Sequence, residues 1–128
     1  MIDMLGYLEP VYFERGTMII NELDEFGEVI FISKGVVSIG YEINKIKKFC
    51  IQYNGKCVIG GFGVTFNQRA TFMYSATTHC EGHFIRQRNW HELLSRYMEI
   101  ADRIKTNVLV DYVMNIRIKV TLAKRKDI

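Results

Sequence analysis

The sequence predicts an α+β fold, in which an eight-stranded β-barrel or jelly roll carries a short N-terminal helix and two C-terminal helices. Short β-rich segments separated by turn signals recur about every 8–12 residues as far as Arg86, which is typical of a sandwich or barrel. From Asn89 onward there is no glycine or proline, and apolar residues recur at helical spacing. The 128 residues are expected to form a single domain, with a helix end at about 1–8, the barrel at 9–87 and the C-terminal helices at 88–125.

The N-terminal segment is expected to pass from a helix into short strands. Met1–Leu8 is interpreted as the end of a short helix. Pro10 is the one proline of the chain and is expected to stop that helix or turn the chain. The short apolar runs Val11–Phe13 and Thr17–Ile20 follow as strand candidates.

The middle of the chain carries the clearest strand signals. Val29–Ser33 is almost wholly apolar, as in a strand covered on both faces, and Lys34-Gly35 joins it to the next strand. Gly40 indicates a bend or bulge, Asn54-Gly55 indicates a tight turn, and Gly60–Gln68 is interpreted as a glycine-rich loop. The other strands are expected at Val36–Ile43, Phe49–Tyr53, Cys57–Ile59, Arg69–Ala76 and Cys80–Arg86.

The C-terminal part is predicted to form two helices. Asn89 and Glu92 have the spacing of a capping box, so a short helix is expected to begin at Asn89 and to run to about Tyr97. A bend near Met98-Glu99 is expected to precede a long helix that ends at about Leu122. The apolar stripe of this long helix consists of Ile104, Val108, Leu109, Tyr112, Val113, Ile116 and Val120.

The composition narrows the function classes. The 17 basic and 14 acidic residues give a net charge of +3, which is too small to indicate nucleic acid. The basic clusters at 45–48 and 119–126 are interpreted as solvated faces in preference to sites for an acidic partner or a membrane surface. Cys50, Cys57 and Cys80 are odd in number and are expected to be reduced and at least half-buried. No signal peptide or membrane-spanning run is expected.

A candidate anion site lies between the predicted strands. Gly60, Gly61 and Gly63 allow the backbone to curl, so that successive N–H groups converge on an anion. Arg69 follows this segment, where its guanidinium can meet a phosphate. The combination of a paired-strand element, a glycine-rich loop and one arginine favours a phosphate site.

These motifs resemble the cyclic nucleotide-binding domain family over roughly Leu5 to Tyr112. The segment from Phe26 to Ile39 is similar to the family pattern G-x-x-x-[YF]-[FI]-I-x-x-G-x-V, and Arg69 matches the phosphate-binding arginine of the R-x-A motif. The F-G-E motif differs, because Gly61 stands at the glutamate that receives the ribose hydroxyl, and the loop is about one residue shorter. Loss of that carboxylate is expected to weaken binding by roughly one to two orders of magnitude.

Within the family, the passage from Phe84 to Trp90, followed by Leu93-Leu94 and Tyr97, resembles potassium channels, particularly those of ciliates. The resemblance implies a regulatory domain at the cytoplasmic face of a membrane, a soluble part of a cyclic nucleotide-gated or voltage-gated channel. Its partners would be the rest of the channel chain and other subunits of a tetramer, and its ligand cyclic AMP or cyclic GMP. The residues assigned to the ligand are Gly60, Gly61, Phe62, Gly63, Arg69 and Ala70, with Val108, Leu109, Tyr112 and Val113 as a lid over the base.

Alternatives to this function remain open. Because Gly61 replaces the family glutamate, the domain is alternatively a structural or assembly module with a degenerate pocket that binds no nucleotide. If a nucleotide binds, Ala70 beside Arg69 cannot donate a hydrogen bond and Thr71 is expected on the opposite face, so a weak lean to cyclic AMP is expected. His79, Glu81 and His83 share one face of a strand, which is interpreted as half-exposed and not as a metal site. With no catalytic set in the sequence, no enzymatic activity and no cofactor are expected.

Overall fold

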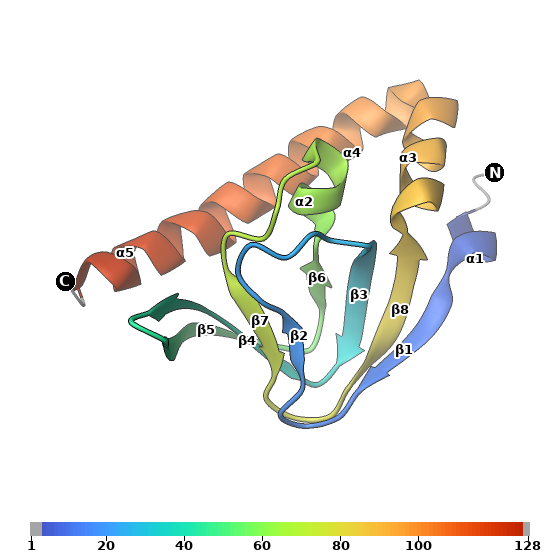
Figure 1. The fold of residues 1–128 in the computed structure, drawn as a ribbon. Helices are drawn as coiled ribbons and strands as arrows, with labels where there is room; N and C mark the ends of the chain where they lie inside the picture. Colours follow the sequence, from blue (N-terminus) through green and yellow to red (C-terminus); the bar gives the residue numbers. More distant parts are fainter. Residues whose placement is uncertain (1–3, 127–128) are drawn as a thin grey trace.

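A computed structural model describes residues 4–126 as two four-stranded antiparallel sheets with a long helix running along one side of them (Figure 1). The sheet orders are β1-β8-β3-β6 and β2-β7-β4-β5. The strands are β1 Glu9–Phe13, β2 Met18–Ile20, β3 Glu28–Lys34, β4 Val36–Ile43, β5 Ile46–Asn54, β6 Cys57–Ile59, β7 Met73–Ala76 and β8 Cys80–Arg86. The helices are α1 Met4–Tyr7, α2 Gly61–Phe66, α3 Gln87–Arg96, α4 Met98–Asp111, the π-helical η1 Tyr112–Arg117 and α5 Ile118–Lys126.

The predicted α+β fold with a jelly roll is confirmed. Each sheet keeps its own two edges, so the strands form a sandwich and not a closed barrel. Val29 and Ile85 from one sheet and Val37 and Ile39 from the other belong to one buried core. The expected bulge at Gly40 is present, because the pairing of β4 with β5 shifts between Ile39 and Gly40.

Of the two predictions about turns at Pro10 and at Asn54-Gly55, the one for Pro10 is wrong. Pro10 neither ends a helix nor turns the chain; it lies within β1, at the edge of its sheet, where a residue without an N–H group is tolerated. The part of the predicted N-terminal helix before Met4 lies outside the described residues. The chain does turn at Asn54-Gly55, where Gly55 has φ +94°, but this turn leads from one sheet to the other and does not close a hairpin. Gly55 donates its N–H to Gly35 O (2.9 Å), so the β3–β4 and β5–β6 crossovers lie together.

Three element boundaries differ from the prediction for local reasons. The glycine-rich segment holds the helix α2 and is not a loop. The strand β7 begins only at Met73, because the backbone of Ala70 is bonded to an earlier loop: its N–H donates to Asp24 O, and its carbonyl accepts from Leu23 N–H. The helix α3 begins at Gln87, whose N–H bonds to Gly27 O (2.9 Å), so Asn89 lies inside the first turn and is not its cap.

The long helix is the feature that positions the site. Tyr97 breaks the helical path between α3 and α4 at the predicted bend, and α4, η1 and α5 then continue as one rod along the sandwich to Lys126 (Figure 1). In the described part of the chain, no helix has the length and apolarity to cross a membrane.

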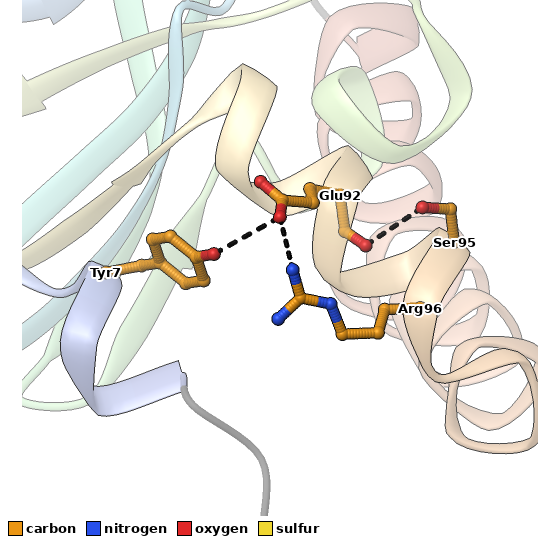
Figure 2. Close-up of polar contacts among 4 residues, drawn as sticks. All are labelled: Tyr7, Glu92, Ser95 and Arg96. Carbon is orange, nitrogen blue, oxygen red and sulfur yellow. Dashed lines mark hydrogen bonds and ion pairs between the residues drawn. The ribbon is translucent and has the colours of Figure 1, made fainter.

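Polar contacts fix the helical end of the molecule. Tyr7 Oη donates to Glu92 Oε1 (3.4 Å), and the same carboxylate oxygen accepts from Arg96, so α1 is joined to α3 (Figure 2). Inside the fold, Trp90 Nε1–H donates to Thr65 Oγ1 (2.9 Å) in a buried contact. This hydrogen bond connects α3 to α2, beside the cavity described below.

Cys57 and Cys80 are free and buried. Burial raises the pKa of Cys57 to about 12, so its thiol stays protonated at neutral pH. Cys50 is exposed on β5, so the expectation that all three are at least half-buried is wrong for this residue.

Candidate ligand-binding cavity

A cavity of about 220 Å³ lies between α2 and the long helix. Of the predicted site, it brings together Gly60, Gly61, Phe62, Gly63 and Arg69, with Val108 and Tyr112 from the helix above them. Seven further residues that the sequence interpretation missed line the same space: Phe26, Val58, Thr71, Tyr74, Asn107, Asp111 and Ile116. The sequence offered no local signal for most of them, since they come from five separate segments.

The glycines of this segment have two different roles. Gly60 has φ +83°, and a Cβ atom on Gly63 would lie 2.1 Å from the ring of Phe26. Both glycines therefore allow α2 to pack directly against the buried Phe26 ring. Gly61 is not constrained in this way: a Cβ there would lie 3.4 Å from Val58 and 3.7 Å from Val108, which is ordinary contact.

Arg69 stands at the edge of the cavity with its guanidinium already engaged. Its Nη2 lies 3.0 Å from Glu25 Oε1, and Nη1 donates to Leu23 O at 3.3 Å. The side chains of Arg69 and Glu25 are 65% and 76% exposed, so water screens their attraction. A bound phosphate would have to replace Glu25 as the partner of Arg69, and the cost of that exchange is small.

The long helix covers the cavity through one aromatic stack. The Tyr112 ring lies parallel to that of Phe62, with centroids 4.2 Å apart and 9° between the planes, and 6.3 Å from the Phe72 ring. Of the other predicted lid residues, Val108 lines the cavity, whereas Leu109 is exposed and Val113 lies outside the lining. The helix thus closes over α2 through residues four apart on one face.

Ala70, which the sequence interpretation assigned to the ligand, does not line the cavity, whereas its neighbour Thr71 does. Ala70 is turned into the core, and Thr71 lines the cavity on the same side as Arg69. The two residues do face opposite ways, as expected, but the side facing the cavity carries the hydroxyl. The argument for a lean to cyclic AMP from Ala70 therefore does not hold in this geometry.

The polar groups around the cavity are mixed in charge. Asp111 lines the cavity from the helix, and its carboxylate accepts from Asn115 Nδ2 (2.7 Å). Burial, more than the nearby Asp111, raises the pKa of Tyr74, whose phenol stays protonated. One cation and one anion thus line a mostly apolar space, which is smaller than the roughly 300–1,000 Å³ of usual small-molecule sites.

The histidines of the predicted strand face do not form a cluster. His79 lies before β8 and stacks on Tyr12, whose hydroxyl is 2.7 Å from His79 Nδ1. Among residues 4–126, no three side chains of the metal-binding types come together as a site.

Comparison with known proteins identifies the fold. No protein-family model matches the sequence, and the search of curated proteins finds no related sequence. Among solved structures, the Xanthomonas campestris regulator CLP, described as c-di-GMP responsive, matches 95% of this chain at 18% identity with a TM-score of 0.74. The Thermus thermophilus catabolite activator protein matches 94% at 12% identity with a TM-score of 0.73.

A channel domain has the same architecture. The C-linker/CNBHD of zELK channels, crystallised in the presence of cAMP, matches 82% of this chain at 18% identity with a TM-score of 0.70. The chain spans 60%, 56% and 53% of the lengths of CLP, the Thermus protein and the zELK fragment. The chain has the fold of the cyclic nucleotide-binding domains, as the sequence motifs predicted.

Proposed function

We propose that this chain is a ligand-sensing regulatory domain that binds cyclic AMP or cyclic GMP weakly. The observation that carries the proposal is the cavity between α2 and the long helix, lined by Gly61 and Arg69 below and by Val108 and Tyr112 above. Arg69 would take the cyclic phosphate in exchange for Glu25, and the apolar residues would cover the base. Nothing in this assignment requires a catalytic group, and we propose no enzymatic activity.

The long helix would transmit the ligand's presence. It contacts α2 through Tyr112 and Phe62, and Tyr53 Oη donates to Asn115 O (3.2 Å) from β5. A ligand shifts a helix between two positions only through contacts that differ between them. Contacts of the base with Val108 and Tyr112 exist only when the helix is closed, so a bound nucleotide would favour the closed position.

The parent protein proposed here is a cation channel, specifically a potassium channel. This proposal is supported by the segment from Phe84 to Tyr97 and by the likeness to the zELK domain. The domain would then lie at the cytoplasmic face of a membrane, with the rest of the channel chain and other subunits of a tetramer as its partners.

The second candidate is a structural or assembly module that binds no nucleotide. Three observations favour it: the cavity is small, Gly61 supplies no acceptor for a ribose hydroxyl, and Asp111 brings a negative charge toward a ligand that is itself an anion. In this module the Tyr112 ring, stacked on Phe62, would itself fill the place of a base.

Calorimetric titration with cyclic AMP and cyclic GMP, up to millimolar concentration, separates the two candidates. Saturable binding with a stoichiometry near one is expected for the sensor, and no saturable heat is expected for the module. Hydrogen exchange across residues 98–126, with and without nucleotide, then tests transmission: the sensor requires slower exchange in the bound state, and equal exchange would contradict the proposed movement of the helix.

A further inference from the structure

Two basic segments that are far apart in the sequence meet at one end of the molecule. The first is the tip of the β4–β5 hairpin with the start of β5, residues 43–50, and the second is α5, Ile118–Lys126. Both lie at the end opposite α1 and α3 (Figure 1). Lys124 of α5 holds its Nζ 5.7 Å from the centroid of the Tyr41 ring on β4, and α5 also packs against β5.

Positive charge is concentrated at this end, and the rest of the chain is net negative. The two segments hold seven of the 17 basic residues and none of the 14 acidic ones. The other ten basic residues are outnumbered by those 14 acidic residues, so the rest of the chain has a net charge of −4. The basic residues of this end are Lys45, Lys47, Lys48, Lys119, Lys124, Arg125 and Lys126.

The basic end also exposes large apolar side chains. Ile46, directly after the hairpin turn at Asn44 and Lys45, is 60% exposed, and Phe49 on the same strand is 43% exposed. On α5, Leu122 is 51% exposed. Lysines on an edge strand such as β5 discourage pairing with other sheets, but that role does not explain an isoleucine at the hairpin tip.

Acidic residues flank this end in the sequence, since Glu42 precedes the hairpin tip and Asp127 follows Lys126. Glu42 is opposite Lys47 in the pairing of β4 with β5, and Glu22 Oε1 accepts from the backbone N–H of Glu42 (2.9 Å). Glu42 offsets part of the charge of Lys47. No acidic residue lies within either basic segment.

We propose that this end, formed by the β4–β5 hairpin tip and α5, binds an anionic lipid surface. Aliphatic side chains between lysines fit a membrane surface, where the amines meet lipid headgroups and the apolar group enters the boundary of the acyl chains. A nucleic acid or an acidic protein could use the lysines, and the exposed Phe49 could stack on a base, but neither partner offers an apolar environment to the exposed Ile46 and Leu122. The two basic clusters thus lie at one end of the fold, and we propose a lipid surface for them where the sequence interpretation favoured solvated faces.

Co-sedimentation with lipid vesicles, in the absence of nucleotide, tests the proposal. The protein is expected to bind vesicles of equal parts phosphatidylcholine and phosphatidylserine, to release at high salt, and not to bind phosphatidylcholine alone. Each basic residue at an anionic surface strengthens binding roughly fivefold, so Lys45→Glu/Lys47→Glu should weaken binding at least tenfold. Ile46→Ser should weaken binding and leave the residual binding more sensitive to salt.

The matched control is Lys34→Glu/Arg88→Glu, which changes the net charge by the same amount at exposed positions on β3 and α3. It should bind the mixed vesicles nearly as the parent protein does. If both double variants lose vesicle binding equally, net charge alone explains the effect and the proposal is wrong. Binding to phosphatidylcholine alone, or tighter binding to duplex DNA or polyglutamate than to the mixed vesicles, would also overturn it. Thermal unfolding of each variant shows that a loss of binding is not a loss of fold.

Discussion

Replacing Arg69 by alanine separates its effect on the ligand from its effect on the fold. The side chain is 65% exposed and its ion pair with Glu25 is screened by water, so the pair contributes only about 0–1 kcal/mol to the free energy of unfolding. The hydrogen bond to Leu23 O is long, at 3.3 Å, and exposed, and adds little. We therefore expect Arg69→Ala to lower the melting temperature by no more than a few degrees.

The effect on nucleotide binding should be far larger. A charge-assisted hydrogen bond from a guanidinium to a phosphate contributes about 1.5–3 kcal/mol, which is a loss of roughly 10- to 150-fold in affinity when the arginine is removed. A second prediction follows because Glu25 competes with the phosphate for Arg69. Glu25→Gln should free Arg69 and tighten nucleotide binding by up to about fivefold, because the ion pair between Arg69 and Glu25 contributes at most about 1 kcal/mol.

Calorimetric titration and thermal unfolding of the same preparations measure both effects. Arg86→Ala is the matched control, because Arg86 also forms an exposed ion pair, with Glu9 (2.7 Å), on strands away from the cavity. It should leave nucleotide affinity unchanged. The assignment is refuted if Arg69→Ala binds nucleotide as tightly as the parent protein, or if it unfolds the domain while Arg86→Ala does not.

Three further substitutions probe the cavity wall and the lid. Gly61→Glu restores an acceptor where a Cβ meets only ordinary contacts, so calorimetry should show roughly tenfold tighter nucleotide binding; unchanged affinity means that the segment lacks the family geometry. Tyr112→Leu loses the stack on Phe62, worth about 0.5–1.5 kcal/mol, and should speed hydrogen exchange in the long helix; identical exchange would show that the stack does not hold the helix. Gly63→Ala places a methyl group 2.1 Å from the Phe26 ring and should lower the free energy of unfolding by about 1–3 kcal/mol, and an unchanged thermal transition contradicts this packing.

The strands were predictable because their signals are local. The boundaries of β4, β6 and β8 agree with the sequence interpretation, and β4 and β6 are apolar or β-branched runs that end at a turn or a glycine. The helix α2 was not predictable on that basis. Three glycines in and before one turn oppose a helix by their propensity, and the packing of Gly60 and Gly63 against the distant ring of Phe26 favours the helix instead.

The cavity shows the same division between local and distant causes. Of the residues that the resemblance assigned to a ligand, Gly60–Gly63, Arg69, Val108 and Tyr112 line one cavity. The direction of Ala70 and Thr71 could not be obtained in this way. That direction depends on hydrogen bonds to Leu23 and Asp24, a loop more than forty residues earlier, which hold residue 70 toward the core.

The π-helical turn η1 in the long helix is related to the exact spacing of the apolar residues along that helix. Ile104, Val108, Tyr112, Ile116 and Val120 recur at every fourth position. In a regular α-helix each four-residue step drifts by about 40° around the axis, so this series would wind away from the sandwich. The wider turn of η1, from Tyr112 to Arg117, offsets that drift, which explains how Tyr112 and Ile116 line the cavity while Val120 stays fully buried. π-turns inside α-helices are frequent at functional sites, and this one begins at the residue that closes the cavity. A spacing of four sustained over so many turns is thus a direct signal for an irregular helix at the lid.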